Sequence, residues 1–418
     1  MRKIYSGLLY LLAPLLPLYL IKRSFKNPDY RLGWSERFGI NLVNPAKKPI
    51  IWLHAVSVGE TRAMHKLVEL INQYLPEYQI LITSMTPTGR KTAQQLYPYA
   101  LVHYIPYDIS FCVKRFYAIF KPKLGIILET EIWPNLVHFA ASNHMPLYLV
   151  NARLSERSYS GYKRFIRVLL PILQCFNGIL CQDQGSAANF TALGYTGKLP
   201  VMGNTKFDLV VNNEVLELIN QFKTKFIGRK VICFASTREG EEKLLLEQIE
   251  FKEDFLYLII PRHPERFTEV ATLCKSQGLK VQMRSEPKKI AQETQIVIGD
   301  SMGEMLAYYA ISWLTIIGGS FRDCGGQNPL EALFMGVPVI FGPSMYNFSE
   351  VAVNSLASSC AMQVDTFSAA DRLIHTLAND PKQYQDYAAN AQQFIANYQG
   401  ASQRIFNLIC ADNQLLAD

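Results

Sequence analysis

With 418 residues, the chain is longer than a single hydrophobic core usually organises, so we expect two domains. Hydrophobic residues make up 49% of the sequence and charged residues 18%, which excludes an intrinsically disordered protein. Lysine and arginine exceed aspartate and glutamate, 42 against 35, a mild basic excess that suits an anionic membrane surface or a phosphate-bearing substrate without requiring either.

An uncharged apolar run at positions 4 to 21 predicts a membrane anchor. Its length is at the threshold for spanning a bilayer, and Pro14 and Pro17 interrupt it, so a spanning helix, a helix in one leaflet and a buried core helix all stay open. Basic residues, rather than a cleavage site, follow the run. We therefore expect residues 1–26 to form an uncleaved anchor with a basic flank, and the positive-inside rule places the following domains in the cytoplasm. The flanking basic residues are Arg2, Lys3, Lys22, Arg23, Lys26 and Arg31.

From residue 49 onward, short β-branched or aliphatic runs alternate with longer helical patterns, which is typical of β-α-β units and a parallel sheet. Six such runs in the first half predict one doubly wound, Rossmann-like α/β domain over residues 27–208. These runs occupy residues 49–57, 79–86, 101–106, 124–131, 146–153 and 178–183.

The strand rhythm pauses over residues 209–228, a polar stretch that fits an interdomain linker or a boundary helix. Six further runs predict a second Rossmann-like domain over residues 229–390. We expect the last segment, residues 391–418, to be helical and to pack back towards the first domain. Two such domains that face each other would leave a cleft at the carboxyl ends of their strands, where α/β sheets bind ligands. The second set of runs occupies residues 230–237, 255–262, 279–285, 294–300, 311–319 and 338–343.

The loop after the first run carries a candidate general base. Ser57, Gly59 and Glu60 follow a strand pattern and precede a helical one, so Glu60 is expected beside a helix N-terminus at the ligand edge. A carboxylate there either stabilises the helix terminus or takes a proton from a substrate. The residues alone leave both roles open.

The fourth run ends in Glu129, Thr130 and Glu131, and residues two apart on a strand point to the same face. Two carboxylates on one face raise the possibility of a metal site. The chain has no Asp-x-Asp triad, however, and no histidine lies close in sequence, so we predict a hydrogen-bonding role and no metal. The eight cysteines are scattered without metal-ligand spacing, and we interpret them as free thiols.

Two loops of the second domain carry basic or glycine-rich sequence. Arg262 follows the second run there and is either a fork for a phosphate or half of a surface ion pair with Glu265. The segment 318–331 begins with four glycines in nine residues and then enters a helix, so its backbone N–H groups could approach a phosphate, or it is an ordinary turn. Neither a P-loop nor a G-x-G-x-x-G fingerprint is present in the sequence.

Several ordered sequence blocks together resemble the 3-deoxy-D-manno-octulosonic acid (Kdo) transferase family. They run from residue 54 to residue 343, and the apolar N-terminal anchor belongs to the same pattern, so the resemblance covers most of the chain. The blocks are HAVSVGE, TSMTPTGR, ETEIWPNL, NARLSERS, GNTKFD, PRHPERF, GDSMGEM and GGQNPLEALFMGVPVIFGP.

The resemblance implies an inverting glycosyltransferase of the GT-B fold class that moves Kdo from CMP-Kdo to a lipid A precursor, lipid IVA, in lipopolysaccharide biosynthesis. It implies no metal and no cofactor. The first domain would meet the acceptor and the lipids of the bacterial inner membrane on the cytoplasmic face, and the second would bind the donor. Basic residues form no strip with interleaved aromatic residues, so no nucleic-acid partner is expected.

By the same resemblance, Glu60 matches the general base, and Glu131 and Lys206 match positions that stabilise the transition state. Glu331 would accept hydrogen bonds from ribose hydroxyls. Cys324 and Gln327 stand where relatives carry basic or imidazole side chains, so no donor contact is carried over to these two. The residues implied in CMP binding are Pro261, Arg262, Met302, Gly303, Glu304, Asn328, Pro329, Leu330 and Glu331.

Two other functions share some of these features. Another GT-B enzyme, such as a nucleotide-sugar epimerase or a transferase with a UDP donor, would share the fold but not the HAVSVGE and ETEIWPNL blocks. A non-catalytic, membrane-tethered lipid-binding protein would explain the apolar run and its basic flank but neither Glu60 nor the glycine-rich loop.

Overall fold

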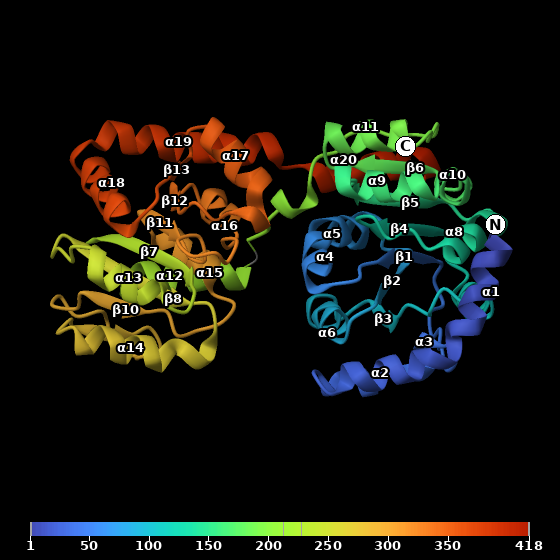
Figure 1. Cartoon of the computed structure of the whole chain (residues 1–418), viewed down its shortest axis with the longest axis horizontal. Coiled ribbons are helices and arrows are strands. Elements are labelled where there is room, and N and C mark those ends of the chain that lie inside the picture. The colour runs from blue at the N-terminus through green and yellow to red at the C-terminus, as the bar shows by residue number, and fades with distance from the viewer. Residues whose placement is uncertain (1, 212, 227, 417–418) are drawn as a thin grey trace. The chain divides into compact units, whose positions relative to one another are not determined.

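The computed structural model describes residues 2–211, 213–226 and 228–416, which form two compact units (Figure 1). Unit 1 comprises residues 1–208 and 399–418, and unit 2 comprises residues 209–398, so the chain passes between the units twice. Residues 1, 212, 227, 417 and 418, which fall in the expected anchor, linker and C-terminal helix, lie outside the described residues.

The N-terminal segment is an almost continuous helix. It consists of α1 (Arg2–Leu12), a 3₁₀ turn η1 (Ala13–Leu15) and α2 (Leu16–Ser24). Pro14 and Pro17 each lie in the first turn of a helical piece, where the missing N–H has no intrahelical partner to lose. By length and composition alone, the 23 residues from Arg2 to Ser24 are long and apolar enough to cross a membrane, with a mean hydropathy of 1.8 over an 18-residue window.

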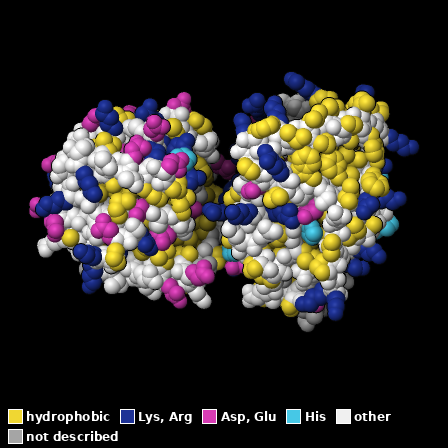
Figure 2. Space-filling model, turned by 90° about the horizontal axis from the view of Figure 1, so that it is seen from below, with side chains coloured by type: hydrophobic (Ala, Val, Ile, Leu, Met, Phe, Trp, Pro, Cys, Tyr) yellow, Lys and Arg dark blue, Asp and Glu magenta, His cyan; other side chains and the backbone are white. Residues whose placement is uncertain are grey.

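Most of the apolar surface of this segment is exposed, so it is not the buried core helix that the sequence left open. Leu11 is 74% exposed and Leu18 is 62% exposed, and apolar side chains gather on the face of unit 1 that carries α1 and α2, with Lys and Arg around them (Figure 2). One side is nevertheless attached to unit 1. The Ser6 hydroxyl donates to Asn135 Oδ1 at 2.9 Å, and Leu20 is fully buried in a cluster with Tyr30.

Unit 1 contains a parallel sheet with the strand order β3-β2-β1-β4-β5-β6. This is the doubly wound order of the Rossmann fold, and the chain reverses its direction of winding between the neighbours β1 and β4. The six expected runs all form strands. They are β1 (Ile50–His54), β2 (Gln79–Ser84), β3 (Leu101–Tyr104), β4 (Leu124–Leu128), β5 (Leu147–Ala152) and β6 (Gly178–Cys181).

Helices cover both faces of this sheet because successive strand residues point to opposite sides. Trp52 belongs to the core beneath α7, α8, α10 and α11, whereas Ile51 and Leu53 belong to the core beneath α4, α5, α6 and α20. The helices are α3 (Trp34–Arg37), α4 (Val58–Ala63), α5 (His65–Tyr74), α6 (Pro87–Leu96), α7 (Ser110–Phe120), α8 (Pro134–Ser142), α9 (Glu156–Arg164), α10 (Ile166–Leu173), α11 (Gln184–Ala192) and α20 (Ala401–Asn413), with 3₁₀ turns η2 (Pro28–Arg31) and η3 (Thr205–Phe207).

Unit 2 contains a parallel sheet with the order β13-β12-β11-β7-β8-β10-β9, in which the winding reverses between β7 and β11. The expected runs again form strands, and together the two sheets confirm the fold class of two Rossmann-like domains. The short edge strand β13 was not predicted. The strands are β7 (Lys230–Thr237), β8 (Phe255–Pro261), β9 (Val281–Met283), β10 (Ile296–Ile298), β11 (Leu314–Ile317), β12 (Val339–Phe341) and β13 (Ala361–Gln363).

The stretch expected as a linker or boundary helix lies in unit 2, where α12 packs against α15 through Phe222 and Tyr308, with ring centroids 5.0 Å apart. On the other face of the sheet, α13, α14 and α18 cover the main core. The helices are α12 (Asn213–Lys225), α13 (Glu241–Gln248), α14 (Phe267–Ser276), α15 (Met305–Ile311), α16 (Leu330–Phe334), α17 (Ser349–Ala357), α18 (Phe367–Asn379) and α19 (Pro381–Tyr398), with 3₁₀ turns η4 (Pro264–Arg266) and η5 (Tyr346–Phe348).

The last helix, α20, returns to unit 1 and packs against α5. Ile405, Phe406 and Ile409 complete the core on that face of the sheet. At the return point, the Asp208 carboxylate accepts hydrogen bonds from the backbone N–H groups of Gly400, at 2.6 Å, and Ser402, at 2.5 Å. The two passages of the chain between the units therefore meet unit 1 side by side.

Candidate functional site

Glu60 lies in the first turn of α4, directly after β1 and therefore beside the point where the winding of the sheet reverses. Its carboxylate accepts hydrogen bonds from the Ser57 hydroxyl and from the Val56 backbone N–H, both at 2.7 Å, and Ser57 caps the helix by accepting from the Glu60 N–H. The capping role is therefore present. It also fixes the carboxylate, which is only 8% exposed, at the ligand edge of the sheet.

The surroundings of Glu60 make its carboxylate more basic than an ordinary glutamate. Burial raises the pKa of Glu60, and the negative charge of Glu129 adds to the rise. The bonds from Ser57 and Val56 oppose it, as does the positive charge of Lys206. A higher pKa strengthens a general base as long as the group stays ionised at the working pH.

The two carboxylates after β4 do not share a strand face, contrary to the expectation. The strand ends at Leu128, and Glu129 has a left-handed backbone with φ of 56°, so the chain turns there. The Glu129 carboxylate instead pairs with Lys206, with Oε1 and Nζ 2.7 Å apart. Glu131 accepts a hydrogen bond from the Trp133 indole N–H at 2.9 Å, and burial raises the pKa of Glu131, with Glu60 and Glu129 adding to the rise.

Lys206 lies on the 3₁₀ turn η3, which the carboxyl end of β5 holds in place. The Asn151 side chain accepts a hydrogen bond from the Thr205 N–H at 3.1 Å, and Asn204 caps the turn by accepting from the Lys206 N–H. The structure thus brings Lys206 and three acids from two loops, Glu60 after β1 and Glu129 and Glu131 after β4, into one electrostatic group. Sequence reasoning singled out Glu60, Glu131 and Lys206 but missed that Glu129 is the residue that binds Lys206.

In unit 2, Pro261 ends β8 and is buried, whereas the Arg262 side chain is exposed. The Arg262 N–H donates to Thr237 O at 3.0 Å, which joins the loops after β7 and β8. Among the described residues, no ion pair joins Arg262 to Glu265, so the guanidinium is open to an anion.

The Met302 to Glu304 segment follows β10 at the same edge of the sheet. Glu304 pairs with Arg284 at 2.7 Å and occupies the N-cap position of α15, without a capping hydrogen bond from its side chain. Met302 is 59% exposed, and a side chain at Gly303, whose φ is +83°, would meet open space. A larger side chain would therefore fit at position 303, although the positive φ there favours glycine.

The segment from Asn328 to Glu331 begins the short helix α16. The Asn328 side chain accepts a hydrogen bond from the Leu330 N–H at 3.1 Å, and Pro329 precedes the first helical residue. Glu331 lies in the first turn, where a carboxylate suits the helix terminus. These residues follow β11, which pairs with β7, so they belong to the same strand edge as Arg262.

The sequence left open whether the glycine-rich loop contacts a phosphate or is an ordinary turn, and four of its N–H groups already have partners within the protein. The N–H groups of Gly319 and Phe321 donate to the Glu241 carboxylate, at 2.6 and 3.1 Å. Gly325 donates to the Ser344 hydroxyl at 3.1 Å, and Gly326 donates to Gly319 O at 2.8 Å. An anion that approached these four groups would have to displace bonds within the protein.

Basic side chains around this loop were missed by sequence reasoning. Arg238 follows β7 and lies 2.7 Å from His263 Nε2, and Arg322 packs over Gly240. A hollow of about 390 Å³ lies beside the loop. Cys324 is a half-buried free cysteine. The hollow is lined by Ser320, Phe321, Arg322, Asp323, Pro343, Ser344, Met345 and Tyr346.

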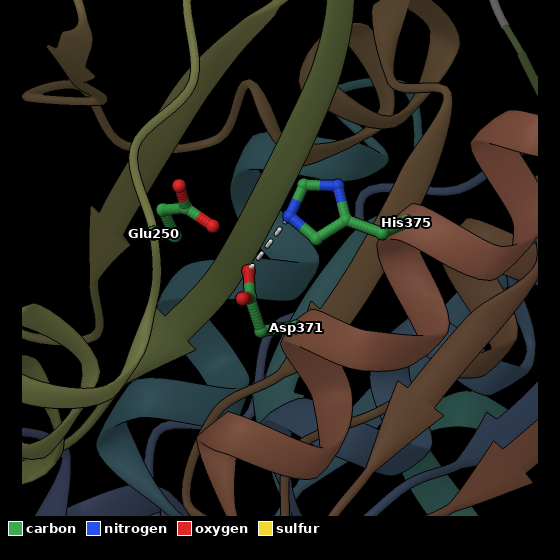
Figure 3. A group of neighbouring side chains, drawn as sticks. All are labelled: Glu250, Asp371 and His375. Carbon is green, nitrogen blue, oxygen red and sulfur yellow. Dashed lines mark ion pairs between the residues drawn. The ribbon is translucent and has the colours of Figure 1, made fainter.

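One group of side chains among the described residues could hold a metal ion, namely Glu250, Asp371 and His375 (Figure 3). His375 Nε2 lies 3.6 Å from Asp371 Oδ1, one turn apart on α18. Glu250 precedes β8, so the group lies at the amino ends of the strands, opposite the ligand edge. We interpret it as an ion pair that stabilises α18.

Comparisons with known proteins agree in one family. Residues 32–209 match the family described as 3-deoxy-D-manno-octulosonic-acid transferase (kdotransferase). A 3-deoxy-D-manno-octulosonic acid transferase of Haemophilus influenzae is 34% identical, with 98% of this chain and 98% of that protein covered. One of Bordetella pertussis is 33% identical, again with 98% of each chain covered.

Solved structures agree with the fold. The UDP-GlcNAc 2-epimerase of Neisseria meningitidis, bound to UDP-GlcNAc, has a TM-score of 0.61 and covers 87% of this chain and all of its own. Its sequence is 15% identical, so the likeness concerns the fold alone.

Proposed function

This chain belongs to the Kdo transferase family and is a glycosyltransferase, and from that premise we propose that it moves Kdo from CMP-Kdo to the lipid A precursor lipid IVA. Membership in this family favours a Kdo transferase over the two alternatives, another GT-B nucleotide-sugar enzyme and a non-catalytic, membrane-tethered lipid-binding protein. The observation that carries the mechanism is the buried Glu60 carboxylate, held at the ligand edge where the sheet reverses its winding.

The acceptor belongs to unit 1. A lipid A precursor has acyl chains that stay in a bilayer, and the exposed apolar helix from Arg2 to Ser24 is attached to the same unit as Glu60. We propose that this helix holds the protein at the cytoplasmic face of the inner membrane, with Lys22, Arg23 and Lys26 towards anionic lipid headgroups.

In the proposed reaction, a sugar hydroxyl of the acceptor attacks the anomeric carbon of Kdo. The new C–O bond forms as the bond from that carbon to the phosphate oxygen breaks, CMP leaves with the electron pair, and Glu60 takes the hydroxyl proton. A single displacement of this kind inverts the configuration at the anomeric carbon. Because CMP is a good leaving group, the position of Glu60 matters more than a large shift of its pKa.

Lys206 and Glu131 are proposed to stabilise the charge that develops in this step. Lys206 supplies a positive charge near Glu60, and Glu129 holds the Lys206 ammonium in place through the 2.7 Å ion pair. Glu131 is oriented by Trp133. As the family resemblance implies, we propose no metal ion and no cofactor for this group.

The donor belongs to unit 2. Arg262 is exposed and suited to bind phosphate, and Glu331 and Asn328 offer acceptors for ribose hydroxyls. Pro261, Met302, Gly303 and Glu304 would line the nucleotide site together with Pro329 and Leu330, because all of them lie at the carboxyl ends of strands of one parallel sheet.

The test is a transfer assay with CMP-Kdo generated in situ and tetraacylated lipid A precursor, with products resolved by mass. Glu60→Gln is the sharpest variant, because a glutamine can still accept from the Val56 N–H and donate to the Ser57 hydroxyl, so it keeps the cap and removes the base. We expect transfer to fall by at least a hundredfold. The exposed Glu77→Gln serves as the matched control and should transfer normally.

The same assay also counts the Kdo units added, which is a property of the acceptor site. Normal transfer by Glu60→Gln would contradict Glu60 as the base and leave it only its capping role. No transfer by the wild type would contradict the proposed donor and acceptor.

A further inference from the structure

A buried carboxylate holds the glycine loop of unit 2, residues 318–326, from a neighbouring loop. Glu241 is fully buried at the start of α13 and accepts hydrogen bonds from the backbone N–H groups of Gly319, Phe321 and Arg238. Arg238 follows β7 and the glycines follow β11, and these two strands are the neighbours between which the winding reverses. One side chain therefore joins the two loops at the point where such sheets bind ligands.

The backbone of the neighbouring segments holds this loop closely in one position. A side chain at Gly318 would come within 2.5 Å of Ser236 O, and a side chain at Gly342 would overlap the backbone at Ser320. The loop is thus pressed between the end of β7 and the loop after β12. In this position the Gly319 N–H is buried, and a buried donor without a partner is destabilising, so the carboxylate of Glu241 stabilises this conformation of the loop.

The glycine loop carries two exposed charged side chains, Arg322 and Asp323, of which Arg322 is the basic one. Phe321 stacks on Phe367, with ring centroids 4.1 Å apart, and the next residue, Arg322, is exposed with its guanidinium over Gly240. Within the described part of the chain, Arg322 makes no ion pair. It borders the hollow of about 390 Å³ beside the loop.

We propose that Glu241 is a positioning residue for donor binding. It holds the glycine loop in place so that Arg322 can bind an anionic group of the donor. This rests on the proposed function, since CMP-Kdo carries two anionic groups, the phosphate and the Kdo carboxylate. An anion cannot use the N–H groups of Gly319 and Phe321, because Glu241 occupies them and its negative charge would repel it. The guanidinium of Arg322 is the group nearest in sequence that can.

The experiment compares Glu241→Gln, Arg322→Gln and the double variant with the wild type, at saturating acceptor. Glu247→Gln, an exposed position on the same helix, is the matched control. We expect each single variant to raise the KM for CMP-Kdo about tenfold with kcat within twofold, and the double variant to be no worse than the more affected single variant. A merely structural role of Glu241 would lower the active fraction, and with it the apparent kcat, at unchanged KM.

Titration with CMP alone distinguishes whether Arg322 binds the phosphate or the Kdo carboxylate of the donor. A loss of CMP affinity in Arg322→Gln assigns the guanidinium to the phosphate, and unchanged CMP affinity with a raised KM for CMP-Kdo assigns it to the carboxylate. Either result supports the proposal. An unchanged KM in Arg322→Gln, or single effects that multiply in the double variant, would overturn it.

Hydrogen exchange gives a readout that does not depend on transfer. The amides of Gly319 and Phe321 should exchange faster in Glu241→Gln but not in Arg322→Gln, whose side chain does not hold the loop. Unchanged exchange in Glu241→Gln would overturn the positioning role. A wild type that transfers no Kdo would instead contradict the proposed function, while the exchange result would still stand by itself.

Discussion

At the scale of single residues, the group around Glu60 combines burial with opposed charges. Glu60 and Glu131 are both raised in pKa by burial, and Lys206 lowers the pKa of Glu60 while Glu129 raises it. The basicity of Glu60 therefore depends on both members of the Glu129–Lys206 ion pair, and removing either one should move it in a known direction.

The pH dependence of transfer tests this arrangement. A general base is active when deprotonated, so kcat/KM should fall as the pH drops through the pKa of Glu60, and this acid limb should lie above the range of an ordinary glutamate. Lys206→Met should move the limb to higher pH, because a neighbouring positive charge is lost. Lys123→Met, an exposed position, is the control, and a limb that Lys206→Met moves to lower pH would contradict the assignment.

The reverse shift is expected from the partner residue. Glu129→Gln removes the negative charge that raises the pKa of Glu60, so the acid limb should move to lower pH. The variant also frees Lys206, so a lower maximal rate is expected at the same time. A pH–rate profile over the acid range measures both effects, and an unmoved limb would mean that Glu60 is not the titrating base.

Stability separates the two roles of Glu60. Glu60→Ala removes the bonds to Val56 and Ser57 and should lower the free energy of unfolding by about 1 kcal/mol, whereas Glu60→Gln should lower it less. Denaturant unfolding of the two variants and Glu77→Gln measures this difference. Equal losses in Glu60→Ala and Glu60→Gln would show that the cap depends on charge rather than on the hydrogen bonds.

At the scale of elements, the runs of β-branched and aliphatic residues predicted the strands well, because buried parallel strands need apolar side chains on both faces. What the sequence could not show was the geometry after each strand ends. The left-handed φ of Glu129 turned the chain away from the expected strand face. For the glycine loop, the sequence left a phosphate contact and an ordinary turn open. It could not show that Glu241 accepts hydrogen bonds from the loop, because Glu241 lies far from it in sequence and only the fold brings the two together.

The N-terminal helix yields a prediction at this scale. Leu11 and Leu18 are exposed, so Leu11→Glu with Leu18→Glu should leave unit 1 folded while weakening its attachment to membranes. Flotation with vesicles that contain anionic lipid measures this. Lys66→Glu, which changes charge away from the helix, is the control, and undiminished flotation of the double variant would contradict the role of α1 and α2 in attachment.

At the scale of the whole molecule, the core of unit 1 depends on a helix from the end of the chain. Ile405 is fully buried against the sheet, so Ile405→Ala should lower the free energy of unfolding by about 2–5 kcal/mol. This is expected even though the whole of unit 2 separates Ile405 from the first segment of unit 1 along the chain. Gln403→Ala, exposed on the same helix, should change little. Equal stability of the two variants would mean that α20 contributes nothing to this core.

Because the chain returns to unit 1, unit 2 is an insertion within the sequence of unit 1. Unit 2 is one continuous stretch of sequence, whereas unit 1 is made of two, and Asp208 bonds to Gly400 and Ser402 across the point of insertion. A single cut by a protease at either passage would leave the two units covalently joined through the other. Removing unit 2 would leave two chain ends, at residues 208 and 399, that already lie close together. A short linker between these two residues should therefore give a continuous unit 1.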